Sequence, residues 1–138
     1  MKLTEGQAQY LHRRVAAALA ALPPGALAEL RAAAGGVRLD TRYRPPRGRR
    51  RVFCAYFDPA RRRVVLRVRL AAQLPAEAVG PLVAQTCAHA VLWRRGGDWQ
   101  SGAAADALAR SWGFDLAALD EWSGYPDQEN GRRGRAGA

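Results

Sequence analysis

The segment PAEAVGPLVAQTCAHAVLWRR, residues 75–95, has the pattern of a long helix on which the rest of the chain can pack. Four of its residues recur at intervals of three and four and therefore share one helical face: Leu82, Thr86, His89 and Trp93. Gly96-Gly97 follows immediately, and glycine is the residue that most often closes a helix. We therefore predict a core helix from Pro75 to Arg95.

Two helices are predicted near the N-terminus. Thr4-Glu5-Gly6-Gln7 has the form of a capping box, in which a threonine side chain and a glutamine side chain close the first turn. An apolar stripe at spacings of three and four follows it: Leu11, Val15, Leu19 and Leu22. This helix should end at Pro23-Pro24, where Pro24 begins a short second helix that closes at Gly35-Gly36.

Three β-rich runs lie between the second helix and the core helix. Val37 to Tyr43 alternates apolar and charged residues, which predicts a half-buried strand. Val52 to Phe57 and Val64 to Leu70 are joined by the turn-forming Asp58-Pro59-Ala60-Arg61, so they should pair as an antiparallel hairpin. The three runs predict a small three-stranded sheet, antiparallel or mixed.

The fold class expected is α+β, with an N-terminal helix, this small sheet, the core helix and C-terminal helices over Ser101 to Trp112 and Asp115 to Trp122. With 138 residues, we expect a single domain over residues 1–122 and a polar, disordered tail over residues 123–138. No run approaches the roughly 18 apolar residues of a membrane helix, and no signal peptide is recognised. We therefore expect a soluble, cytoplasmic protein without a membrane partner.

Charge is strongly polarised along the chain, whose net charge is +10. Residues 38–69 contain twelve arginines against Asp40 and Asp58, whereas residues 96–130 carry a net charge of −6. We expect a basic patch built from two arginine runs: Arg47, Arg49, Arg50, Arg51, Arg61, Arg62 and Arg63. Such a block can bind nucleic-acid phosphates or an acidic protein surface. The alternative is a solvated strand face that docks on the chain's own acidic C-terminal third.

Several segments, taken in order, resemble the zincin-like minimal metallopeptidases, of which the SprT-like and ImmA-type proteins are relatives. In that family a hairpin with a Tyr-x-Asp-Pro-like turn leads into an H-E-x-x-H helix, and a later helix carries an Ala-Asp or Ala-Asn segment. Here Tyr56-Phe57-Asp58-Pro59 matches the turn, and AADALARSWGF, residues 104–114, is similar to the later helix. The resemblance covers residues 50 to 114 and implies a zincin-like fold. Because relatives are associated with DNA repair and gene regulation, it also implies a setting of that kind.

The catalytic motif of that family is degenerate in this chain. Gln85-Thr86-Cys87-Ala88-His89 stands where the family has His-Glu-x-x-His, in which two histidines bind zinc and the glutamate is the general base. Gln85 is a poor zinc ligand, and Thr86 cannot accept the proton. The third ligand would fall near residues 102–104, yet the first carboxylate is Asp106. We therefore expect no catalytic residue, metal or cofactor, and a vestigial site made of Gln85, Thr86, His89 and Asp106.

Simpler interpretations apply to the same residues. His89 can be a partly buried residue that is hydrogen-bonded inside the fold, Cys87 a small core side chain, and Asp106 a helix cap or a partner of Arg110. The tryptophans can supply the large core side chains that this alanine-rich chain otherwise lacks, or line an aromatic groove: Trp93, Trp99, Trp112 and Trp122.

Three functions remain open on the sequence. The first is a pseudoenzyme that binds or regulates a protein partner through the old substrate groove around Gln85, His89 and Trp93. The second is an arginine-rich protein that binds nucleic-acid phosphates with little base specificity. The third is an active metallopeptidase, which would require zinc held by His89 and Asp106 with His12 or Cys87. A homodimer would be unsurprising, although nothing demands one.

Overall fold

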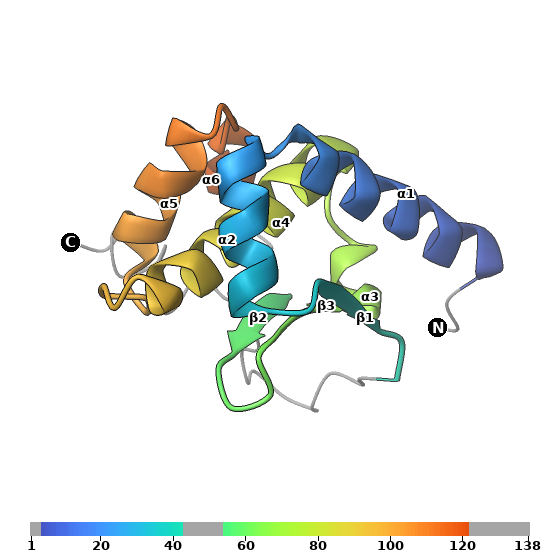
Figure 1. Cartoon of the computed structure of the whole chain (residues 1–138). Helices are drawn as coiled ribbons and strands as arrows, with labels where there is room; N and C mark the ends of the chain where they lie inside the picture. Colours follow the sequence, from blue (N-terminus) through green and yellow to red (C-terminus); the bar gives the residue numbers. More distant parts are fainter. Residues whose placement is uncertain (1–3, 43–53, 122–138) are drawn as a thin grey trace, which may run out of the picture.

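The core helix forms as α4, Ala76–Arg94, and lies at the centre of the fold (Figure 1). The computed structural model describes residues 4–42 and 54–121. Seven consecutive residues of α4, residues 82–88, are buried, so every side of this helix is covered. Helices contact α4 on several sides and the sheet contacts it on another, which explains why small alanines fill so much of its surface.

Helices α1, Glu5–Ala21, and α2, Pro24–Ala33, both pack against α4. The predicted capping box forms: the Gln7 N–H donates to Thr4 Oγ1 at 3.1 Å, and the Thr4 N–H donates to Gln7 Oε1 at 2.9 Å. None of the described helices is by itself long and apolar enough to span a membrane. Taken together α1 and α2 reach that length and apolarity, but they are bent by 118° against one another.

The sheet has three strands, β1 Val37–Asp40, β2 Ala55–Asp58 and β3 Arg63–Arg67, in the order β1-β3-β2. It is mixed, because β1 runs parallel to β3 whereas β2 runs antiparallel to it. The predicted hairpin between β2 and β3 is thereby confirmed. Val64 and Leu66 belong to the core shared with α4, and side chains alternate along a strand, so Arg63, Val65 and Arg67 face the other side of the sheet.

Two predicted strands are shorter in the structure. β1 ends at Asp40 instead of reaching Tyr43, and β3 ends at Arg67 instead of Leu70. Asp40 is the last residue of β1 to pair with β3, so beyond Arg67 the chain has no β1 partner. It turns into a short helix, α3, Val68–Ala71, which places apolar side chains in the core. The apolar run in the sequence indicated burial correctly but not the change from strand to helix.

The C-terminal helices are α5, Gly102–Ser111, and α6, Ala117–Glu121. Ser101 caps α5 by accepting the Ala104 N–H at 3.1 Å, and Gly113 follows α5 with a φ of +97° that suits glycine. The predicted α+β class is confirmed, with a small mixed sheet and several helices. The basic residues Arg47, Arg49, Arg50 and Arg51, and the predicted tail over residues 123–138, lie outside the described residues.

Candidate functional site

Gln85 and His89, four residues apart on α4, are hydrogen-bonded to one another through their side chains. Gln85 Nε2 lies 3.1 Å from His89 Nε2, and His89 Nδ1 is bonded to the carbonyl oxygen of Trp99. A carbonyl oxygen only accepts, so Nδ1 carries the ring proton and Nε2 accepts from the Gln85 amide. Both ring nitrogens are thus engaged inside the protein.

Burial lowers the pKa of His89 below its ordinary value of 6.5, while the Trp99 carbonyl and the charge of Asp106 oppose that shift. The effect of burial is the largest of the three, because removing water from the ring disfavours the imidazolium. The neutral tautomer that satisfies Gln85 and Trp99 is therefore also the form that burial favours.

The remaining residues of the predicted vestigial site divide into two groups. Asp106, on α5, is 1% exposed and close enough to His89 to influence its pKa, so the structure brings Gln85, His89 and Asp106 together. Thr86 is 2% exposed, and its hydroxyl donates to the Leu82 carbonyl at 2.8 Å within the same helix. Its hydroxyl is therefore committed to the helix backbone.

These residues do not fit a zinc ion. Within residues 4–42 and 54–121, no three histidine, cysteine or carboxylate side chains gather as a metal ion requires. The one histidine of the motif is bonded at both nitrogens, and burial raises the pKa of Cys87 to about 12, so that thiol stays protonated. His12 is exposed on α1.

The depressed pKa of His89 predicts a pH dependence of stability. The unfolded chain takes up a proton near pH 6.5 and the folded chain only at lower pH, so the free energy of unfolding should fall as the pH drops below about 6.5. The hydrogen bond from Arg95 lowers the pKa of Glu29 below its ordinary value of 4.5, so protonation of that carboxylate changes the free energy of unfolding only at pH values below this range. Urea denaturation between pH 7.5 and 5.5 should show this slope in the wild type and in His12→Gln, but a smaller slope in His89→Gln. An unchanged slope in His89→Gln would contradict the assignment.

Trp93 packs closely against other side chains. Its ring centroid lies 5.3 Å from that of Phe57, and the guanidinium carbon of Arg62 lies 5.9 Å from the Trp93 centroid. Trp99 meets Phe57 edge-on at 5.8 Å. These contacts favour the interpretation of Trp93 and Trp99 as packing side chains, whereas Trp122 lies outside the described residues.

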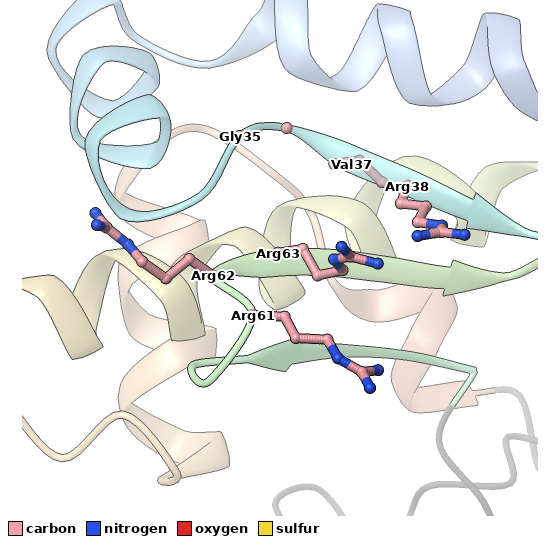
Figure 2. Close-up of a pocket in the computed structure, with 7 residues that line it drawn as sticks. Gly35, Val37, Arg38, Arg61, Arg62 and Arg63 are labelled. Carbon is pink, nitrogen blue, oxygen red and sulfur yellow. The ribbon is translucent and has the colours of Figure 1, made fainter.

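A pocket of about 380 Å³ opens between the start of β1 and the turn that joins β2 to β3. Two glycines, one valine and four arginines line it: Gly35, Gly36, Val37, Arg38, Arg61, Arg62 and Arg63. Figure 2 shows the guanidinium groups of Arg38, Arg61 and Arg63 pointing to the same side, whereas Arg62 points away from them toward the end of α2. Part of the predicted basic patch therefore forms a concave site.

The side chains of Arg38, Arg61 and Arg63 have no hydrogen bond or ion pair with any described residue. The predicted alternative, in which the basic segment docks on the acidic C-terminal third, is thus not realised by these three side chains in the described ranges. Asp58 lies opposite Arg63 in the sheet register, yet its Oδ1 accepts the N–H groups of Ala60 and Arg61 at 3.0 and 3.3 Å. That carboxylate builds the turn that presents the arginines.

Arg62, in the middle of the arginine run, is structural. Its guanidinium donates to the carbonyl oxygens of Ala32 at 2.5 Å and Ala33 at 3.3 Å, at the end of α2 where unsatisfied carbonyls concentrate negative charge. Its φ is +52°, which is uncommon for a residue with a side chain. The Gly35 N–H donates to the Arg62 carbonyl at 3.4 Å, so the two walls of the pocket are tied together.

We expect Arg62→Ala to lower the free energy of unfolding by about 2 kcal/mol, because it removes two charged hydrogen bonds and leaves a strained φ. Arg62→Gly should cost less, since glycine tolerates the positive φ. Arg61→Ala and Arg63→Ala should stay within about 0.5 kcal/mol of the wild type. Urea denaturation measures all four variants. Equal costs at positions 61 and 62 would contradict the distinction.

The sequence did not identify Gly35 and Gly36 as site residues, and it placed Arg38 in the basic block of residues 38–69 but not in the basic patch. The two glycines were interpreted as a helix end and Arg38 as the polar face of a strand, and each interpretation is locally correct. What brings them to the 61–63 turn is the parallel pairing of β1 with β3, in which Arg38 lies opposite Val65. A comparison with models of protein families, curated proteins and solved structures finds no match.

Proposed function

We propose that this chain is a non-catalytic module that binds nucleic acid through its phosphate backbone, using Arg38, Arg61 and Arg63. One observation carries the proposal: three guanidinium groups without an acceptor among the described residues line one pocket. Charged groups on a protein surface are ordinarily solvated or paired, and three of the same sign at one concave site attract an anion. The net charge of +10 adds a long-range attraction of the same sign.

Regularly repeated phosphates suit a group of three arginines. Guanidinium groups bind both carboxylate and phosphate oxygens through paired hydrogen bonds, and the backbone of a nucleic acid repeats the phosphate group at short, regular intervals. The lining contains neither a carboxylate nor an amide side chain to read cytosine or adenine, and its arginines, which could read guanine, are in this proposal engaged by phosphates. Binding should therefore depend little on sequence.

The proposed loss of catalysis rests on the α4 site. The zincin-like affiliation remains a proposal carried by the order of the segments, and the hydrogen bond between Gln85 and His89 supports a framework from which the metal has been lost. In this interpretation the central helix serves only to hold the sheet and its arginines in place. Hydrolysis of a peptide by the unmodified protein would contradict this part of the proposal.

Salt dependence tests the proposed function. Fluorescence anisotropy with two unrelated 20-base-pair DNA duplexes should give affinities that agree within a few fold. The logarithm of the association constant should fall linearly with the logarithm of salt concentration, with a slope of about −3 if three phosphates are neutralised. Binding that is absent at low salt, or that is unaffected by salt, would overturn the proposal. Tighter binding to a poly-glutamate peptide than to either duplex would point to an acidic protein instead.

A further inference from the structure

The arginine pocket is concave, and its walls are fixed before any ligand arrives. The Gly35–Arg62 backbone bond joins the two walls, Arg62 anchors the turn to the end of α2, and Asp58 closes the turn from within. None of these contacts uses the side chain of Arg38, Arg61 or Arg63. Their backbones are therefore held while their guanidinium groups remain available, which is the arrangement of a preorganised binding site.

One wall of the pocket carries no side chain. A Cβ atom added to Gly35 or Gly36 would meet nothing within 4 Å, so the space over these glycines is open to a ligand. Because glycine has no Cβ atom, a group that enters the pocket can approach the backbone here more closely than it could at a residue with a side chain. Gly36 has a φ of +135°, which restricts this position to glycine, whereas Gly35 is not in that region.

The charge of the pocket exceeds what one internal phosphodiester provides. Three arginines whose guanidinium groups point to the same side line the pocket, and no acidic residue lines it, whereas each internal phosphate of a nucleic acid carries a single negative charge. A terminal phosphate monoester carries a charge of nearly −2 at neutral pH and three acceptor oxygens. An internal phosphate is joined to the nucleic-acid backbone on two sides, whereas a terminal phosphate is joined on one. A terminal phosphate can therefore enter the pocket with only one backbone segment beside it.

We propose that the pocket formed by Gly35, Gly36, Arg38, Arg61 and Arg63 binds the terminal phosphate monoester of a nucleic-acid strand. This inference rests on the proposed function and deepens it, because it identifies which phosphate is recognised. Arg38 and Arg63 neutralise the dianion from the strand side, Arg61 from the turn, and the glycine wall admits the phosphate. No lining residue recognises the base, so the end of the strand is bound whatever its sequence.

Three 12-nucleotide single strands of one sequence test this inference by fluorescence anisotropy: one with hydroxyl ends, one with a 5′-phosphate and one with a 3′-phosphate. We expect at least one phosphorylated strand to bind about tenfold more tightly than the hydroxyl-ended strand. Gly35→Leu should abolish this preference by filling the pocket while keeping all three arginines, and Gly25→Leu on α2, which also meets open space, should preserve it. Inorganic phosphate at millimolar concentration should displace the phosphorylated strand.

The outcomes separate this inference from the proposed function. Equal affinities for the three strands, with binding still salt-dependent, would overturn terminal recognition and leave backbone binding intact. Failure of all three strands to bind would overturn the proposed function itself. A preference that survives in Gly35→Leu, when thermal denaturation shows that variant to be folded, would place the terminal phosphate outside this pocket and overturn the inference.

Discussion

Replacing Arg38, Arg61 and Arg63 together by alanine should weaken binding to a 20-base-pair duplex by about 100-fold at low salt. Each exposed guanidinium that contacts a phosphate contributes about 1 kcal/mol, and 1.4 kcal/mol corresponds to a factor of ten in affinity. The slope of the logarithm of the association constant against the logarithm of salt concentration should also become shallower by about 3. The fold should be unaffected, because none of the three side chains bonds to a described residue.

A matched variant separates the pocket from net charge. Arg13, Arg14 and Arg94 lie on α1 and α4, are exposed, and are not among the residues that line the pocket. Replacing these three by alanine removes the same charge, so affinity should fall by only a few fold through the weaker long-range field. Equal losses in the two triple variants would show that the site is diffuse, and the pocket would lose its role.

Thr86→Glu, which introduces a carboxylate at position 86, should destabilise the protein by about 3 kcal/mol or more at pH 7. The site is 2% exposed and lies in the middle of a helix that is covered on every side, so the carboxylate would lose its water without gaining a partner. Burial raises the pKa of an introduced carboxyl group above its value in the unfolded chain. The part of the destabilisation that comes from the charge should therefore shrink as the pH falls and disappear below about pH 4, where the group is protonated in both states.

Thr86→Gln is the matched control, because it has the size of glutamate without the charge. It should cost about 1–3 kcal/mol through overpacking, and this cost should not vary with pH in the same range. Urea denaturation of both variants at pH 7 and pH 4 measures the difference. If Thr86→Glu matched Thr86→Gln at pH 7, position 86 would face solvent or a polar cavity, and a buried, inactive α4 site would be contradicted.

The double variant Gln85→His, Thr86→Glu should show no peptidase activity.

Local patterns in the sequence predicted most of the elements correctly. The capping box at Thr4 and Gln7, the hairpin around Asp58 and the ends of α4 depend on residues close in the chain, and each has a short-range physical cause. The end of β3 at Arg67 could not be predicted in this way. It depends on where β1, more than twenty residues earlier, stops pairing.

The two candidate sites differ in how well the sequence predicted them. Gln85 and His89 are one helical turn apart, so their contact follows from the spacing, but the Trp99 carbonyl comes from the loop before α5 and has no sequence signal. The run Arg61-Arg62-Arg63 predicted a basic patch without distinguishing its members. Only the positive φ of Arg62 and the nearby end of α2 direct the middle arginine toward that helix end and leave its neighbours available for a ligand.

The most direct test is a ¹H–¹⁵N NMR titration of the labelled protein with a hydroxyl-ended DNA duplex. If the sheet surface carries the function, the largest changes in amide chemical shift should fall on residues 35–38 and 61–63, and on the side-chain Nε–H groups of Arg38, Arg61 and Arg63. Signals of α4 around Gln85 and His89 should move little. Changes centred on His89 and Asp106, with the arginine turn unaffected, would contradict this assignment and place the binding site around Gln85, His89 and Asp106 instead.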